Sequence, residues 1–334
     1  MKAKTIISKT CNILIPALLG GGIIWWMYRE FDFTLIRDTL CGGMKWGWML
    51  FSLVFGITAQ VFRGLRWKQT LAPLGENPST MNCIHAIFLS YASSLIFPRS
   101  GEVLRCGVLK KYDGTSFSKS LGTVVTERVI DSLLILLTTF IVFLLQIKTF
   151  LTFFEETGTN FSAWFHTFTV TGWIVTIVCV LLTLVFLYVL LKHFTGESRI
   201  RRIINDLKAG IFSLKDVKNK GLFIFYTLAI WASYFIHFYL TFFCFDYTEN
   251  LSFMTTLVAF IIGTIAVVVP VPLNGIGPWH FAVKTILVLY GVAATNAEIF
   301  VMIVWGVQTA LIPVLGLYSL LALLTKKPKT KDNN

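Results

Sequence analysis

A proline, a glycine and three charged residues stand next to apolar sequence in the stretch Ser94-Leu-Ile-Phe-Pro-Arg-Ser-Gly-Glu-Val-Leu-Arg105. This stretch gives the strongest indication of the fold. A second charged stretch, Thr126-Glu-Arg-Val-Ile-Asp131, opens a long apolar run. An ionised side chain at the centre of a bilayer costs at least about 2.5–3.5 kcal/mol, so such groups must pair or face a cavity. We therefore expect the rest of the chain to be a membrane-embedded scaffold around a polar cluster.

The composition is that of a membrane protein. Apolar residues make up 55% of the 334 residues and charged residues only 14%, whereas soluble domains are about 25% charged. The six cysteines form no Cys-x-x-Cys pair, and no metal-ligand spacing, nucleophile motif or phosphate-binding Gly-Lys-Ser/Thr loop is present. We therefore predict no metal, no cofactor and, despite the net charge of +12, no nucleic-acid partner.

Hydropathy predicts two kinds of membrane segment. Runs of roughly 20 apolar residues can cross a bilayer, and they fall at 11–28, 46–62, 120–146, 169–191, 221–244 and 299–324. Two other stretches are shorter: residues 82–97 end at Pro98-Arg-Ser-Gly101, and residues 252–269 run into Pro270-Val-Pro-Leu-Asn-Gly-Ile-Gly-Pro278 before a second short apolar piece, 279–293. Proline and glycine at this density end a helix. The expected fold is an all-α polytopic membrane protein with about six spanning helices and two broken re-entrant hairpins.

The positions of the basic residues favour the hairpins. If both hairpins return to the side they entered from, 23 of the 29 Lys and Arg residues lie in cytoplasmic segments and four outside. If 82–97 crossed alone, this bias would reverse for the rest of the chain. Short cytoplasmic loops collect Lys and Arg. We therefore expect a multi-pass protein of the cytoplasmic (inner) membrane with both termini in the cytoplasm.

The order of segments predicts two membrane repeats. Residues 1–146 and 169–324 each read helix, helix, broken hairpin, helix, but start on opposite sides, with an extracytoplasmic loop at 147–168 and a basic cytoplasmic tail at 325–334. Inverted repeats of this kind place a substrate site near the midplane, where the broken segments meet. The cytoplasmic link 192–220 is amphipathic, and it either sets topology through its charge or senses anionic lipid.

The first hairpin and the helix after it carry charges suited to an anion. Arg99, Glu102 and Arg105 surround the break, and arginine binds phosphate through a planar fork that cannot lose its proton. Glu127 and Asp131 are four residues apart and so share a helix face, with Arg128 on an adjoining arc. We expect these three to form the floor of a cavity, with Arg128 held by a carboxylate and partly free. The alternative is that all three are solvated at the cytoplasmic end of their helix.

Further candidates lie in the second hairpin and the second helix. Asn274-Gly-Ile-Gly-Pro278 has the glycines needed for an irregular backbone, which is tolerated at depth only when buried or lining a cavity. His280 and Lys284 follow on one face, and Lys284 has no obvious interface to reach. Arg63 and Arg66 either extend to lipid headgroups with Trp67 as an interface anchor or receive a phosphate first. The predicted substrate-binding residues are Arg63, Arg66, Arg99, Glu102, Arg105, Glu127, Arg128, Asp131, Asn274, His280 and Lys284.

At four motifs the sequence resembles the flippase-like integral membrane proteins that include the membrane region of lysylphosphatidylglycerol synthases. The motifs are Arg63-Gly-Leu-Arg-Trp67, Pro98-Arg-Ser-Gly-Glu-Val-Leu-Arg105, the Ser118 to Asp131 run and Asn274-Gly-Ile-Gly-Pro278. The resemblance implies a cavity between two inverted halves that moves a phospholipid or lipid-linked precursor between leaflets. It also implies that the cavity is lined by Arg99, Glu102, Arg105, Glu127, Arg128 and Asp131.

Two departures from the family pattern limit what the resemblance implies. The soluble aminoacyl-transferring domain of the synthases is missing, so lysine transfer to lipid is not implied. Trp279-His280 stands where relatives often carry a glutamate, so the resemblance does not identify the headgroup of the substrate lipid.

Three functions remain in view at this point. The first is a non-enzymatic lipid translocase for an anionic phospholipid or a polyprenyl-phosphate-type lipid. The second is a membrane enzyme acting on a lipid phosphate, with Glu127 or Asp131 as acid or base and His280 as its partner. The third is a non-catalytic partner of a separately encoded glycosyltransferase or synthase. A second copy of the chain is a further candidate partner.

Overall fold

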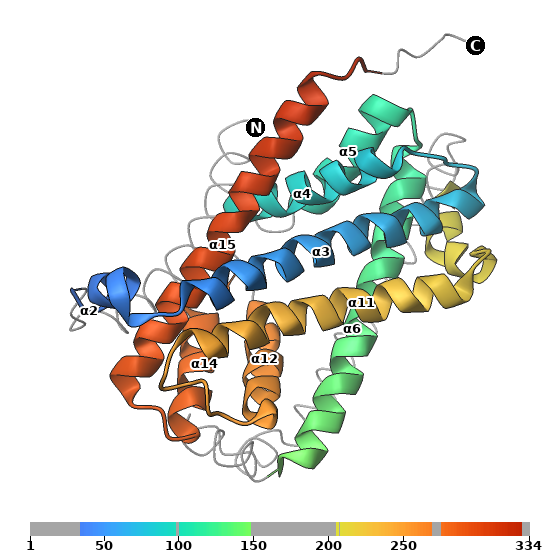
Figure 1. The fold of residues 1–334 in the computed structure, drawn as a ribbon. Coiled ribbons are helices and arrows are strands. Elements are labelled where there is room, and N and C mark those ends of the chain that lie inside the picture. The colour runs from blue at the N-terminus through green and yellow to red at the C-terminus, as the bar shows by residue number, and fades with distance from the viewer. Residues whose placement is uncertain (1–33, 98–99, 148–204, 207, 269–274, 329–334) are drawn as a thin grey trace, which may run out of the picture.

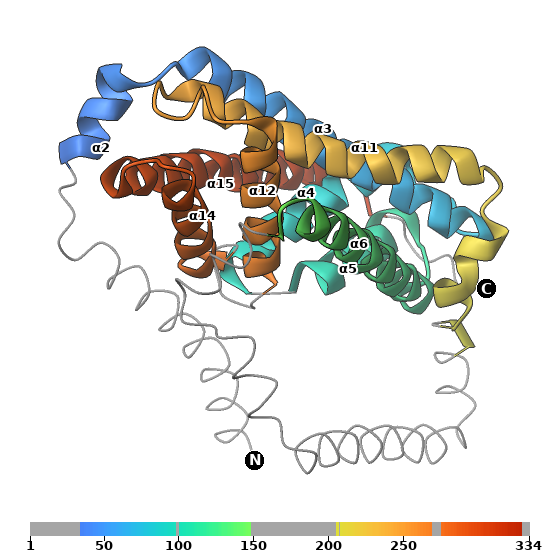
Figure 2. The ribbon, with the colours of Figure 1, turned by 90° about the horizontal axis from the view of Figure 1, so that it is seen from below.

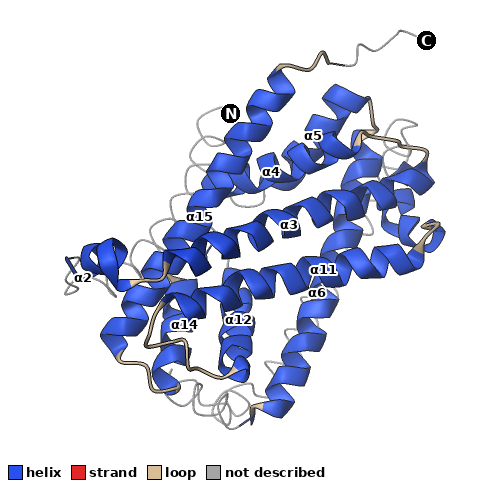
Figure 3. Cartoon of the chain, in the orientation of Figure 1, coloured by secondary structure: helices blue, strands red, loops and turns tan. Residues whose placement is uncertain are grey.

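The computed structural model describes residues 34–97, 100–147, 205–206, 208–268 and 275–328 (Figure 1). Within these ranges the regular elements are helices, and no strand occurs (Figure 3). The all-α fold class is therefore confirmed. The predicted spanning helices 11–28 and 169–191, residues 148–168 of the predicted loop, and residues 192–204 and 207 of the link lie outside the described residues.

Four described helices are long and apolar enough to cross a bilayer. They coincide with the predicted runs 46–62, 120–146, 221–244 and 299–324. Their bounds are α3, Trp46–Leu71, continued by a 3-10 turn at Ala72–Leu74; α6, Phe117–Leu145; α11, Lys220–Tyr239, continued by a 3-10 turn at Leu240–Cys244; and α15, Ala294–Leu324. A short helix, α2 (Thr34–Asp38), and a π-helical turn (Thr39–Gly43) precede α3.

Each predicted break separates two shorter helices that pack against each other. In the first pair α4 (Thr80–Ile96) contacts α5 (Ser100–Asp113), and in the second α12 (Phe253–Val267) contacts α14 (Pro278–Leu289). The chain therefore turns back at both interruptions, as expected for hairpins. Gly275 and Gly277 have φ angles of 82° and 91°, a region that residues with a Cβ atom rarely adopt.

Gly101 has a different role from the one its sequence context suggests. It lies in the first turn of α5, not in a left-handed turn. A Cβ atom at this position would lie 2.0 Å from the backbone oxygen of Ser90 on α4. The glycine is required because α4 and α5 approach each other closely there.

The long helices α3 and α11 lie side by side and form one layer (Figures 1 and 2). The two helices can come close because α3 has a glycine, Gly56, where it contacts α11. A Cβ atom on Gly56 would lie 3.0 Å from His237 Nε2. His237 Nδ1 is also hydrogen-bonded to the Ser52 backbone oxygen at 2.7 Å. The two hairpins, α6 and α15 lie on one side of this layer (Figure 2).

A salt bridge connects Lys45, the residue just before α3, to the loop that follows the 3-10 turn at the end of α11. Lys45 Nζ lies 2.8 Å from Asp246 Oδ1 and also bonds Glu249. Hydrogen bonds raise the pKa of Lys45 to about 12, with Asp246 making the larger contribution and Glu249 the smaller. Lys45 therefore stays charged throughout the ordinary pH range.

The helices follow the same order in both halves. The sequence α3, hairpin α4–α5, α6 is matched by α11, hairpin α12–α14, α15. Contacts cross between the halves in a corresponding way, since α4 packs on α15 and α12 touches α6. This order agrees with the predicted repeats, while an inverted relation between them stays a prediction.

Candidate functional site

Seven charged side chains from three helices form a cluster on the inner side of α3 and α6. We call it the arginine–carboxylate cluster, and its members are Arg63, Arg66, Glu102, Arg105, Glu127, Arg128 and Asp131.

Asp131 is the centre of this cluster. It accepts hydrogen bonds from Arg63 Nη1 at 2.9 Å and from Arg66 Nη1 at 2.7 Å. Helix periodicity explains the geometry, because residues three or four apart on a helix share a face. Arg63 and Arg66 on α3 therefore both reach the same carboxylate on α6.

Glu127, one turn before Asp131, binds a different arginine. Its Oε2 accepts from Arg105 Nη1 at 2.9 Å, and its Oε1 lies 3.7 Å from Arg66 Nε. The side chains of Glu127 and Arg66 are 0% exposed, so these groups are not solvated at a helix end. That alternative for Glu127 and Asp131 was wrong, because the α3 and α5 arginines cover both carboxylates.

Aromatic rings hold the buried arginines in place. The Arg63 guanidinium lies 5.8 Å from the ring centre of Tyr91 and 5.7 Å from that of Tyr234, whose hydroxyls are 3.2 Å apart. The Arg105 guanidinium lies 4.7 Å above the Trp67 ring. A desolvated cation over an aromatic face gains about 2 kcal/mol. Both arginines are thus fixed by rings as well as by carboxylates.

Arg128 is the most exposed arginine of the cluster. Its Nε lies 3.0 Å from Glu102 Oε1, and the two side chains are 43% and 34% exposed. An ion pair at this exposure contributes little, about 0–1 kcal/mol. Arg128 can therefore exchange Glu102 for another anion at small cost.

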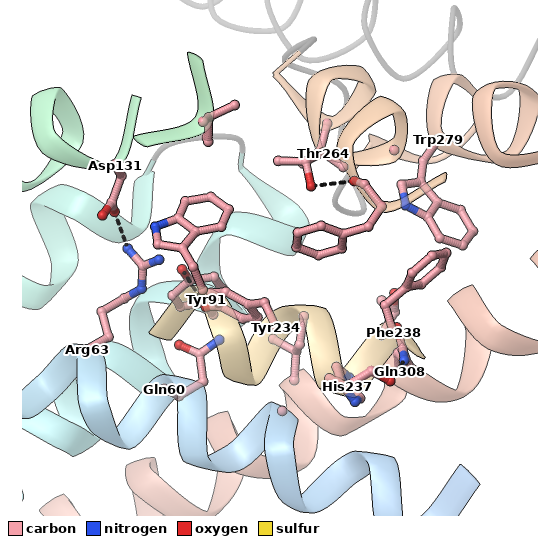
Figure 4. Close-up of a pocket in the computed structure, with 18 of the residues that line it drawn as sticks. Gln60, Arg63, Tyr91, Asp131, Tyr234, His237, Phe238, Thr264, Trp279 and Gln308 are labelled. Atoms are coloured by element: carbon pink, nitrogen blue, oxygen red, sulfur yellow. Dashed lines mark hydrogen bonds and ion pairs between the residues drawn. The ribbon is translucent and has the colours of Figure 1, made fainter. Parts of the chain in front are cut away.

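Arg128 and Glu102 belong to the wall of a cavity of about 710 Å³, which lies between helices α3 to α6 and helices α11 to α15. Arg63 and Asp131 lie at one end, whereas Phe238 and Trp279 lie at the other (Figure 4). The cavity therefore carries its guanidinium and carboxylate groups at one end, and aromatic rings together with His237 and Gln308 at the other. An amphipathic molecule with an anionic group matches this distribution.

Seven of the eleven predicted site residues lie on the cavity wall or in the cluster behind it. Those on the cavity wall are Arg63, Glu102, Arg128 and Asp131. Those in the cluster behind the wall are Arg66, Arg105 and Glu127. His280 and Lys284 are in neither group, and Arg99 and Asn274 lie outside the described residues.

Two expectations about single residues were wrong. Arg63, Arg66 and Trp67 do not extend to headgroups: Trp67 is buried and donates its indole N–H to Thr123 Oγ1 at 2.9 Å. Lys284 is bound by Glu298 of α15, a partner that hydropathy did not reveal because it lies beyond a turn at Gly291. The ring of His280 lies 5.0 Å from that of Trp305.

Sequence reasoning missed the neutral residues of the cavity wall, among them Gln60, Tyr91, Trp231 and Tyr234. A signal for Gln60 was present. Buried residues recur every three or four positions along α3, at Ser52, Gly56, Gln60, Arg63, Trp67 and Thr70, and all of these except Trp67 are small or polar. In a membrane helix such a stripe marks the face that packs on protein.

The fold and site define a class: a helical polytopic membrane protein with a buried ion-pair cluster beside an amphipathic cavity. The sequence model of the family described as lysylphosphatidylglycerol synthase TM region matches residues 13–316. The chain belongs to this family, which is tied to lipid modification in membranes. Neither the curated proteins nor the solved structures gave a significant match.

Proposed function

We propose that this protein moves an anionic, phosphate-bearing lipid between the leaflets of the cytoplasmic membrane. The observation that carries the proposal is the position of Arg128: half-exposed, weakly held, and on the wall of a cavity that is charged at one end and mainly aromatic at the other. Arginine pairs with phosphate through two parallel hydrogen bonds, which are stronger than bonds between neutral groups.

The charge balance of the cluster supports an anionic ligand. Four guanidinium groups face three carboxylates, which leaves one positive charge. A phosphodiester carries one negative charge and would restore neutrality on binding. In this proposal the phosphate displaces Glu102 from Arg128, while Arg63, Arg66 and Arg105 keep their carboxylates.

A translocation path follows from the same arrangement. The headgroup would occupy the charged end of the cavity while the acyl chains remain in the membrane, which lowers the cost of taking a charge through hydrocarbon. We further propose that the two halves are inverted repeats that open the cavity to either leaflet in turn, with both termini in the cytoplasm. A phospholipid and a polyprenyl phosphate both satisfy this chemistry.

The state of the carboxylates favours transport over chemistry on the lipid. Each of Glu127 and Asp131 is engaged by arginine within 3 Å. An acid or base for catalysis must be within hydrogen-bond reach of its substrate. Glu127 is not on the cavity wall, and Asp131, which is on it, already accepts hydrogen bonds from Arg63 and Arg66. Binding of a second copy of the chain, or of a separately encoded synthase, does not conflict with transport.

The test is leaflet transfer of a fluorescent anionic phospholipid in vesicles that contain only this protein. We expect Arg128→Ala to slow transfer about tenfold or more, because a hydrogen bond to a charged group contributes about 1.5–3 kcal/mol. Arg128→Lys should retain part of the rate. Arg37→Ala, an exposed arginine of α2 away from the cavity, is the matched control. Equal rates for wild type, Arg128→Ala and Arg37→Ala would refute the proposal.

A further inference from the structure

A second, smaller cavity of about 370 Å³ lies between α6, the turn before α11 and the start of α11. We call it the lysine-rimmed groove. It is lined by Ile130, Leu214, Lys215, Val217, Lys220, Phe223 and Ile224. Five of these side chains are apolar and two are cationic.

Hydrogen bonds hold the segment that forms one wall of the groove against α6. Thr126 Oγ1 of α6 lies 2.9 Å from the backbone oxygen of Ile211 and 3.1 Å from that of Gly210, and Ser213 Oγ closes the turn itself by donating to Gly210 O at 2.8 Å. Gly210 permits the contact, because a Cβ there would lie 2.6 Å from the Gly122 Cα. The wall is therefore a built part of the fold.

The rim of the groove is cationic. Lys215 and Lys220 are both exposed, and within the described ranges neither forms an ion pair with a carboxylate. The segment 208–220 contains four lysines and one acidic residue, Asp216. An anion placed above the groove would meet an excess of positive charge.

The apolar wall of the groove continues onto an exposed apolar surface of α11, a helix long and apolar enough to cross a bilayer. Ile224 lines the groove and is 57% exposed, and Phe225 and Leu228 beside it on α11 are exposed as well. An acyl chain can therefore reach the groove without leaving the apolar surface of a membrane-spanning helix. A soluble anion would fill the rim but leave the apolar wall uncovered.

We propose that the lysine-rimmed groove binds one anionic phospholipid of the membrane, with an acyl chain against Val217, Phe223 and Ile224 and the headgroup phosphate on Lys215 and Lys220. The site is separate from the central cavity and does not depend on the translocation proposal. It does contact the same machinery: Phe223 lies 5.9 Å below the Arg66 guanidinium, and Ile130 precedes Asp131.

The experiment uses the full-length protein in nanodiscs with two photo-crosslinking lipids. Both lipids carry the same diazirine-bearing acyl chain and differ in their headgroups. One has the anionic phosphatidylglycerol headgroup and the other the zwitterionic phosphatidylcholine headgroup. Crosslinked peptides are mapped by mass spectrometry. We expect the anionic probe to label residues 214–224 several-fold more than the zwitterionic one, since each lysine near a headgroup contributes about a fivefold preference.

Two double variants separate the site from general surface charge. Lys215→Ser with Lys220→Ser should reduce the labelling ratio to about one, whereas Lys110→Ser with Lys111→Ser, exposed lysines of α5, should leave it unchanged. Labelling by both probes alike in the wild type, an unchanged ratio in the first variant, or equal loss in both variants would each overturn the proposal.

Discussion

Asp131 joins the two arginines of α3 to α6, and its loss should weaken the whole membrane fold. Replacing it by asparagine leaves Arg63 and Arg66 buried without their carboxylate. Removing one partner of a buried ion pair costs about 3–5 kcal/mol. We therefore expect Asp131→Asn to lower the thermal midpoint of the detergent-solubilised protein strongly.

The control for this change is Asp216→Asn. Asp216 is exposed and forms no ion pair within the described part of the chain, so its loss should leave the midpoint within about one degree, as surface changes usually do. If Asp131→Asn unfolded at the same temperature as Asp216→Asn, the buried pairs would not hold α3 and α6 together.

Glu102 competes with the ligand for Arg128, so its removal should strengthen binding. The pair is about one-third to two-fifths exposed and contributes at most about 1 kcal/mol. Glu102→Gln should therefore increase the apparent affinity for an anionic lipid by up to about fivefold, as read from transfer rates over a series of lipid concentrations. Glu298→Gln, which frees Lys284 away from the cavity, should not. A weaker affinity in Glu102→Gln would show that Glu102 itself contacts the ligand.

The spacing of residues predicted part of this chemistry. Glu127 and Asp131 four apart correctly indicated one shared face, and Arg128 beside them is held by a carboxylate and partly exposed as expected. The partners were not predictable in the same way. Arg63 and Arg66 lie more than sixty positions earlier, and nothing local distinguishes an arginine that reaches a headgroup from one that reaches a buried carboxylate.

At the level of helices, the first hairpin depends on one glycine. A Cβ on Gly101 would overlap the Ser90 oxygen at 2.0 Å, and backbone cannot move aside as a side chain can. Gly101→Ala should destabilise by about 1–3 kcal/mol or more through overpacking, measured as a lower thermal midpoint.

Gly107 in the same helix provides the comparison. No atom lies within 4 Å of a Cβ built there, so Gly107→Ala should be neutral or stabilise by about 0.5–1 kcal/mol. Equal effects of the two alanines would mean that close contact between α4 and α5 is not what requires Gly101.

The extent of the helices was largely readable from the sequence, and their inward faces were not. Apolar runs located α3, α6, α11 and α15, and proline with glycine located both interruptions. Membrane helices are apolar on every side, so hydropathy does not show which side meets protein. For α3 the small and polar stripe from Ser52 to Thr70 carried that information.

At the scale of the whole molecule, the cavity exists because helices from both halves surround it. Its walls take residues from α3 to α6 and from α11 to α15. The sequence indicated a chamber between two broken segments, yet Lys284, expected there, is bound to Glu298 instead. Which side chains line a chamber depends on how whole helices rotate and pack, and no short motif encodes that.

The central claim is that the cavity, through Arg128, holds an anionic lipid. The most direct measurement is the amount of phosphate-bearing lipid that co-purifies with the protein in mild detergent, quantified by mass spectrometry. Wild type and Arg128→Ala are compared, each also carrying Lys215→Ser and Lys220→Ser so that lipid in the lysine-rimmed groove does not contribute. We predict about one anionic lipid per protein with Arg128 present and a loss of most of it with alanine. Equal amounts of anionic lipid in the two proteins would contradict the account.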